Sequence, residues 1–261
     1  MARSDSRTDV LAGRHPVRDA LDRADGRVEK VYFQRGVHGS AIDGIRRSAR
    51  AAGVPVQMVP RPKIDALAPQ AEHQGVVAVV APVAYRDLDA LLSEVAPDLE
   101  AVRARKPVLV VLDEVEDPRN FGAILRSAVA AGAAGAVVPE RRMAPLSAVA
   151  VKASAGTALA LPIARASSLA DALHQLKERG YWVVGLADAG GDGPGETTTV
   201  WDYDWDRPVA IVVGNEGAGL RPGVRAACDV LASIPMRGPA ESLNASVAAG
   251  IALFAAVRDR D

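Results

Sequence analysis

Cysteine is almost absent from this 261-residue chain, which contains a single one, Cys228. One thiol cannot form a disulfide within the chain, so the sequence fits a reducing compartment, and we expect a cytoplasmic protein. Cys228 lies among apolar neighbours, as expected of a buried structural thiol. The four histidines are scattered and show no ligand spacing with acidic residues or with Cys228, so no metal site is expected.

Long apolar runs are also missing. The longest uncharged stretch, residues 242–257, contains Ser and Asn and is shorter than the roughly 20 apolar residues of a membrane span, so no membrane partner is expected. There is no Gly-Lys dipeptide and hence no ordinary P-loop. The stretches "GGDGPG" and "GNEGAG" miss the G-x-G-x-x-G spacing, and no G-x-S-x-G elbow occurs. These absences disfavour dinucleotide oxidoreductases and serine hydrolases.

The charge that is present is unevenly distributed. The formal net charge is -1, yet residues 1–82 carry 13 Lys and Arg against 9 Asp and Glu, while the remainder carries 18 against 23. A basic N-terminal part beside an acidic remainder is consistent with a module that faces nucleic acid. Ordinary scatter of surface charge explains it equally well at this level.

Hydrophobic patterning predicts two α/β units. Residues 1–8 read as a flexible tail, and residues 9–82 as a small unit of short strands and helices. Residues 83–105 are charged and partly helical, and are expected to be a linker rather than core. Residues 106–261 alternate buried strands with helices, which predicts an α/β domain with a mostly parallel sheet. Its first strand, "VLVVL", has the continuous apolar character of a strand covered on both faces.

Three loops of the second unit follow apolar strands and carry polar side chains among small residues. They are "DEVEDPRNFGAILRS", "GNEGAGL" and "RGPAESLNASVAAG". Ligands of open α/β sheets bind at the carboxyl ends of the strands, where these loops lie. The third loop places Ser242, Asn244 and Ser246 at the start of a helix, although one side chain is enough for capping. The surplus suggests a binding surface.

The motifs in these loops resemble a known family. "NFGAILR", "VVGNEGAGL" and "SIPMRGPAESLNASVAAGIALF" resemble, in order and spacing, the three motifs of the SpoU/TrmH family of S-adenosylmethionine-dependent RNA ribose 2'-O-methyltransferases. "KASAGTAL" matches a further family segment. The N-terminal unit, with "GRHPVRDAL" and "EHQGVVA", resembles the L30e-like substrate-binding domain of the ribosomal RNA branch. The resemblance extends from about Val10 to Arg258.

The resemblance carries expectations about fold and activity. It implies a catalytic domain with a trefoil knot, a homodimer formed through that domain, and S-adenosylmethionine as cofactor without a metal. The expected substrate is RNA, with a guanosine of large-subunit (23S) ribosomal RNA in first place. Transfer RNA and an adenosine whose methylation confers antibiotic resistance stay open. A non-enzymatic RNA-binding protein is a more distant alternative, because it would not need all three motifs.

The resemblance also implies roles for individual residues. The cofactor contacts fall on Gly214, Ile234, Leu243, Asn244 and Ser246, and the catalytic group comprises Asn120, Arg126, Glu216, Ser242 and Asn244. A glycine at 214 would let the cofactor approach the backbone.

Arg126 is a candidate base or a clamp for phosphate and developing negative charge. A guanidinium group keeps its proton far above neutral pH, so neutralising it near pH 7 costs roughly 7 kcal/mol, which favours the clamp. Asn120 would orient Arg126, and Glu216 would set its geometry or receive the proton. Whether Arg126 acts in its own chain or across the dimer stays open.

Overall fold

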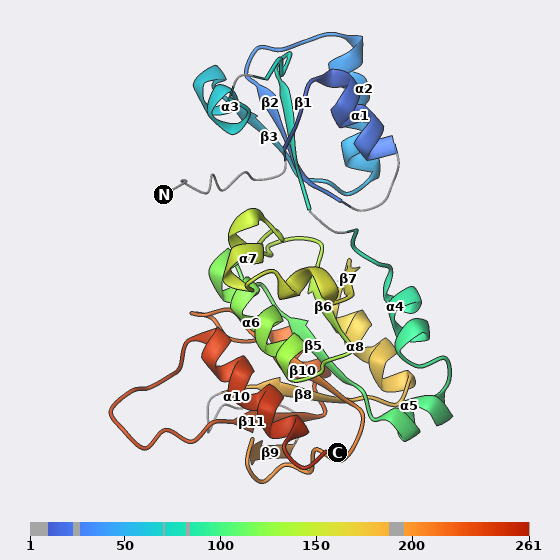
Figure 1. Cartoon of the computed structure of the whole chain (residues 1–261), viewed down its shortest axis with the longest axis vertical. Coiled ribbons are helices and arrows are strands. Elements are labelled where there is room, and N and C mark those ends of the chain that lie inside the picture. Colours follow the sequence, from blue (N-terminus) through green and yellow to red (C-terminus); the bar gives the residue numbers. More distant parts are fainter. Residues whose placement is uncertain (1–9, 23–26, 70, 82–83, 188–195, 261) are drawn as a thin grey trace. The chain divides into compact units, whose positions relative to one another are not determined.

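The computed structural model describes residues 10–22, 27–69, 71–81, 84–187 and 196–260. The predicted tail, residues 1–8, lies outside the described residues, as does the expected junction at 82–83. The chain divides into two compact units, one of residues 1–85 with 145–149 and one of residues 86–144 with 150–261 (Figure 1).

The first unit contains a four-stranded sheet with the order β1-β4-β2-β3. Strand β4 pairs antiparallel with β1 and β2, whereas β2 and β3 are parallel. Successive side chains of a strand point to opposite faces, and the sheet is accordingly covered on both. Helices α1 and α2 bury one face, and α3 buries the other. The elements are β1 (Val10–Ala12), α1 (Arg14–Asp22), β2 (Val28–Gln34), α2 (Ser40–Ala51), β3 (Val56–Val59), α3 (Arg61–Leu67) and β4 (Val76–Val80).

The second unit contains a seven-stranded sheet with the order β7-β6-β5-β10-β8-β11-β9, in which every neighbouring pair of strands is parallel. The predicted mostly parallel α/β sheet is therefore confirmed. The strands are β5 (Val108–Leu112), β6 (Gly135–Pro139), β7 (Ile163–Ala166), β8 (Trp182–Leu186), β9 (Glu196–Thr199), β10 (Val209–Val213) and β11 (Val230–Ser233). The trefoil knot stays a prediction of the resemblance.

Helices cover both faces of this sheet (Figure 1). Helices α4, α5, α8 and α9 share one core with alternate residues of the central strands, among them Leu109 and Val111. The intervening strand residues point to the opposite face, where α10 contacts β10 and packs beside α6. The helices are α4 (Leu88–Val95), α5 (Leu99–Arg105), α6 (Pro118–Ala130), α7 (Ala148–Ala153), the 3₁₀ turn η1 (Thr157–Ala160), α8 (Leu169–Glu178), α9 (Pro222–Ala227) and α10 (Ala245–Val257).

The segment expected to be a linker differs from that expectation. Residues 88–105 form α4 and α5, and Leu88, Leu91 and Leu92 are buried in the core of the second unit. These leucines recur at the helical spacing of three and four, so one face of α4 is apolar. The charged residues between them lie on the solvent face. The high charge content of the segment led to the linker expectation, although one face of α4 belongs to the core.

Because all strands of the second sheet run in the same direction, their carboxyl ends share one edge. The loops that follow β5, β10 and β11 are the three loops singled out in the sequence. No helix among the described residues has the length and apolar character that crossing a membrane requires.

Candidate functional site

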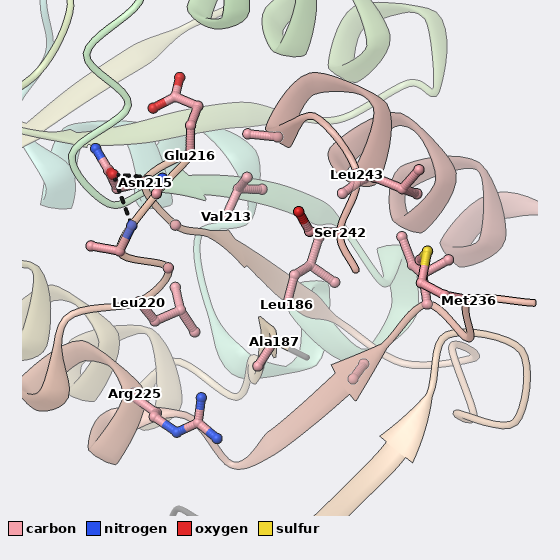
Figure 2. A pocket seen from close by; sticks show the side chains of 18 residues that line it. Leu186, Ala187, Val213, Asn215, Glu216, Leu220, Arg225, Met236, Ser242 and Leu243 are labelled. Atoms are coloured by element: carbon pink, nitrogen blue, oxygen red, sulfur yellow. Dashed lines mark hydrogen bonds between the residues drawn. The ribbon is translucent and has the colours of Figure 1, made fainter. Parts of the chain in front are cut away.

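A pocket of about 340 Å³ lies at the carboxyl ends of β8, β10 and β11. Figure 2 shows apolar side chains around it, including Leu186, Leu220, Met236 and Leu243. Much of the remaining wall is the backbone of the loop 214–219. Backbone groups offer hydrogen bonds of fixed direction and the apolar side chains offer flat contact area, a combination that suits a ring-containing small molecule.

Asn215 organises the loop that follows β10. Its backbone N–H donates to the carbonyl of Gly219 at 3.0 Å, and the N–H of Gly219 donates back at 3.0 Å. Its side-chain Oδ1 accepts from the N–H groups of Gly217 and Ala218 at 2.9 and 3.1 Å (Figure 2). Its Nδ2 donates to the carbonyl of Glu114 at 2.9 Å. One asparagine thus closes the loop and joins it to the loop after β5.

Gly214 lines the pocket, but the structure gives a different reason for a glycine there. A Cβ at this position would lie 2.5 Å from the carbonyl oxygen of Gly219 and 2.6 Å from the backbone nitrogen of Leu220. A side chain would therefore collide with the loop itself. The glycine permits the loop to close, whatever ligand the pocket holds.

A fully buried carboxylate, Asp113, joins the same two loops. Its side chain has no exposed surface and accepts from the backbone N–H of Arg221 at 2.8 Å and from Arg221 Nε at 2.6 Å. Arg221 Nη1 also lies 3.2 Å from Glu114 Oε1. Leu220, the residue before Arg221, lines the pocket. The pocket wall is thus held to the end of β5 by a charged hydrogen-bond pair.

A chain of hydrogen bonds brings residues from all three loops together. Asn120 Nδ2 donates to Glu216 Oε1 at 2.8 Å, and Asn244 Nδ2 donates to Asn120 Oδ1 at 3.1 Å. Asn244 is the N-cap of α10, where its Oδ1 accepts from the backbone N–H of Ser246 at 2.9 Å and from Ser246 Oγ at 2.6 Å. Asn244 therefore performs the capping, and it also reaches across to α6.

The predicted site residues divide into three groups. Gly214, Glu216, Ile234, Ser242 and Leu243 line the pocket. Asn120, Asn244 and Ser246 are not among the lining residues and connect to it through Glu216. Arg126 is exposed on α6, lies outside the lining, and has no hydrogen bond or ion pair within the described part of the chain.

Sequence reasoning missed three residues that build this site. Asp113 was visible as the first residue after "VLVVL", and Asn215 as an amide between glycines, a frequent turn former. Arg221 gave no local signal, because its partners are 107 and 108 positions away in the sequence.

A second pocket, of about 780 Å³, lies in the first unit. It is basic: Arg14, Arg18 and Arg61 line it together with His15, against the single carboxylate of Glu72. His73, also in the lining, accepts from the backbone N–H of Gly75 through Nδ1 at 3.0 Å and is hydrogen-bonded to Asp65 through Nε2 at 2.8 Å. Among the described residues, no group of three or more His, Cys, Asp or Glu is placed to hold a metal ion.

The second unit belongs to the class of α/β domains that bind a small molecule or cofactor at the carboxyl edge of a parallel sheet. The pocket of backbone groups and apolar side chains at that edge is typical of this class. Comparison with known proteins identifies the family within this class. Residues 107–254 match the model of the SpoU rRNA Methylase family, and residues 10–86 match that of RNA 2'-O ribose methyltransferase substrate binding. The chain belongs to the SpoU rRNA methylase family and is an RNA methyltransferase. The family predicted from the three motifs is confirmed.

Related proteins cover nearly the whole chain. An uncharacterized tRNA/rRNA methyltransferase of Mycobacterium ulcerans is 42% identical over 97% of this chain and 78% of its own length. A Staphylococcus haemolyticus protein assigned to the TrmH family of tRNA/rRNA methyltransferases is 39% identical over 96% of both chains.

Solved structures show the same fold. The SpoU methyltransferase AviRb from Streptomyces viridochromogenes matches with a TM-score of 0.58 and 29% identity, covering 99% of this chain and 91% of its own. The AdoMet-bound rRNA methyltransferase from Sinorhizobium meliloti matches with a TM-score of 0.59 and 28% identity, covering 99% and 90%.

Proposed function

We propose that this protein transfers a methyl group from S-adenosylmethionine to the 2'-hydroxyl of a ribose in RNA, in the cytoplasm, with a guanosine of 23S ribosomal RNA as the first candidate. The observation that carries the proposal is the juxtaposition of the 340 Å³ pocket with the hydrogen-bonded cluster of Asn120, Glu216 and Asn244. The AdoMet-bound relative from Sinorhizobium meliloti supports the cofactor.

The residues of the pocket fit this cofactor. Ile234, Met236 and Leu243 offer apolar surface for an adenine ring, and the backbone of residues 214–219 offers groups for its edge. Bound S-adenosylmethionine supplies a methyl group activated by a positively charged sulfur. The pocket residues hold and orient it, and the reaction gains most from that positioning. No metal is required for this chemistry.

The polar cluster beside the pocket would hold the ribose. Ser242 lines the pocket and can hydrogen-bond a hydroxyl, and Glu216 is an exposed carboxylate that can accept its proton. Asn120 and Asn244 fix the orientation of Glu216 through the hydrogen bonds described above. In this arrangement Glu216 and Ser242 contact the reacting hydroxyl, while Asn120, Asn244 and Ser246 position them.

Arg126 would act as a clamp for phosphate rather than as a base, for the energetic reason given above. Its position outside the pocket of its own chain supports action in the site of a second copy. A homodimer is consistent with α10, on which Val247 and Phe254 expose 49% and 52% of their surface one above the other.

The first unit would select the RNA. Its 780 Å³ pocket is lined by three arginines, which are suited to phosphate recognition. No pocket-lining residue of the candidate cofactor site comes from this unit. We therefore assign RNA selection to residues 9–82 and the chemistry to residues 106–261. The relatives are described as tRNA/rRNA methyltransferases, so transfer RNA is the second candidate substrate.

Methylation mapping tests the proposal. Purified protein with S-adenosylmethionine would be incubated separately with unmodified 23S rRNA transcript and with unmodified tRNA, and 2'-O-methyl positions mapped by alkaline resistance. We expect one new 2'-O-methyl guanosine in 23S rRNA, and none with an Asn244→Ala variant. A methyl group on tRNA, on an adenosine or on a base would overturn the first candidate. Binding of RNA with no methyl transfer would overturn the activity.

A further inference from the structure

A third pocket, of about 400 Å³, lies in the second unit on the same edge of the sheet as the cofactor pocket. It is formed where β5, β6 and β7 end. None of the residues assigned above to the cofactor, the ribose or the clamp lines it. Its polar lining residues are Glu114, Arg141, Arg142, Ser167, Ser168 and Arg221.

The charges of this pocket are only partly compensated. Arg221 forms ion pairs with Asp113 at 2.6 Å and with Glu114 at 3.2 Å, and its role is structural. Arg142 lies 3.6 Å from Glu114 and is 73% exposed, which makes that pair weak. Arg141 is exposed and has no hydrogen bond or ion pair within the described ranges. The pocket therefore presents one free and one weakly paired guanidinium.

Two serines at the end of β7 line the same pocket. Ser167 is exposed beside the pocket, and Ser168 is the N-cap of α8, where its Oγ accepts from the N–H of Asp171 at 3.3 Å. Guanidinium groups and hydroxyls are the side chains that most often contact the phosphates and sugars of nucleic acids. A flat forked guanidinium can also bind two phosphate oxygens at once.

The sheet order fixes where this pocket lies relative to the cofactor. Strand β6 is two positions from β10 in the order β6-β5-β10. Parallel strands are about 4.8 Å apart, so the two strand ends are separated by about 10 Å. Leu220 lines the cofactor pocket and Arg221, the next residue, lines the third pocket. The two pockets are therefore close enough for nearby nucleotides of one RNA strand to occupy both.

We propose that the third pocket binds a backbone phosphodiester of the substrate RNA next to the methylated nucleotide, through Arg141 and Arg142. This contact positions the strand along the edge of the sheet and carries no sequence information of its own. The inference rests on the proposed function, because it takes the RNA that the cofactor pocket would serve as the ligand.

The test uses the full chain and unmodified 23S rRNA transcript. Arg141→Ala and Arg141→Ala/Arg142→Ala would be compared with Arg103→Ala. This control removes an arginine of α5 that is also exposed and lies before β5, hence at the opposite edge of the sheet. RNA affinity would be measured without cofactor over a range of salt concentrations. Each lost phosphate contact lowers the slope of log K against log salt by about 0.7 to 0.9.

We expect Arg141→Ala to weaken RNA binding about tenfold at moderate salt and to lower the slope by nearly one unit, with a further drop in the double variant. The KM for RNA should rise while kcat at saturating RNA and the Kd for S-adenosylmethionine stay unchanged. Arg103→Ala should match wild type in slope and KM. Equal behaviour of Arg141→Ala and Arg103→Ala would overturn the inference.

Two further arms separate the alternatives. If inorganic phosphate, at matched ionic strength, competes with RNA more strongly for wild type than for the Arg141 variant, the pocket binds phosphate groups, as expected. If phosphate binding depends on Arg141 while RNA affinity does not, the pocket takes a free anion and the inference fails. If Arg141→Ala lowers the slope as expected but wild type transfers no methyl group, the proposed function fails while the contact stands.

Discussion

Replacing Asp113 with asparagine should loosen the cofactor loop and destabilise the second unit. The carboxylate is fully buried and accepts two hydrogen bonds, both from Arg221. Asparagine has nearly the same size but offers one oxygen, so an amide NH₂ group would face a donor of Arg221. A buried donor left without its acceptor costs about 1–3 kcal/mol. The partial exposure of Arg221, 41% of its side chain, keeps the expected loss below the 3–5 kcal/mol of a fully buried broken pair.

A loss of about 2 kcal/mol corresponds to a decrease in Tm of about 4–8 °C for a domain of this size. We would measure it by thermal unfolding, with Asp89→Asn as the matched control. Asp89 also binds an arginine, Arg179, at 3.0 Å, but it is 63% exposed, so its replacement should cost under about 1 kcal/mol. Calorimetry should show roughly tenfold weaker S-adenosylmethionine binding for Asp113→Asn, since 1.4 kcal/mol is a factor of ten. Indistinguishable Tm and Kd values for the two variants would refute the reasoning.

Three other predictions concern the site and the core. Arg126→Lys should lower the methylation rate by roughly 10²–10³-fold, because lysine lacks the planar fork of the guanidinium group. The pH–rate profile of the variant should stay parallel to that of wild type. A variant profile that rises with pH where wild type is flat would refute the clamp. Gly214→Ala should abolish cofactor binding by displacing the backbone of Gly219 and Leu220, whereas Gly223→Ala, with open space around its Cβ, should retain it in the same calorimetric titration. Burial raises the pKa of Cys228 from 9.0 to about 12 and the pKa of Tyr181 and Tyr203 from 10.0 to about 12. The unfolded chain then releases these protons first, so denaturant titrations should show stability falling from about pH 9 to pH 12, and a flat profile over that window would contradict the burial.

Patterning of the strands made the second sheet predictable. "VLVVL" and "VAIVV" are fully buried runs, and such runs occur in parallel strands that are covered on both faces. The three loops followed from the rule that parallel strands end at a shared edge. The segment of α4 was expected to be partly helical, but its place in the core was not predicted, because charged residues on its solvent face dominated the composition although its leucines have helical spacing.

The finer structure of the site depends on contacts between distant parts of the chain. Asn120 and Asn244 are 124 positions apart, and Asp113 and Arg221 are 108 apart. No local pattern specifies which donor meets which acceptor over such separations. The glycine at 214 illustrates the same limit, because its neighbours Gly219 and Leu220 come within reach only when Asn215 closes the loop. Motifs identified the residues, and tertiary structure supplied their partners.

The hydrogen bonds between Ser246, Asn244, Asn120 and Glu216 all have the same polarity. Each side chain donates to the next, and the series ends at Glu216. Asparagine and serine can each donate or accept, so they could also be arranged in the reverse direction. An ionised carboxylate only accepts and the backbone N–H of Ser246 only donates, so these two groups together select one of the two orientations for the bonds between them. Dipoles aligned in this way reinforce one another and converge on the carboxylate oxygen. A carboxylate on one loop and a backbone N–H of α10 thereby require the same amide orientation at the start of two helices, α6 and α10.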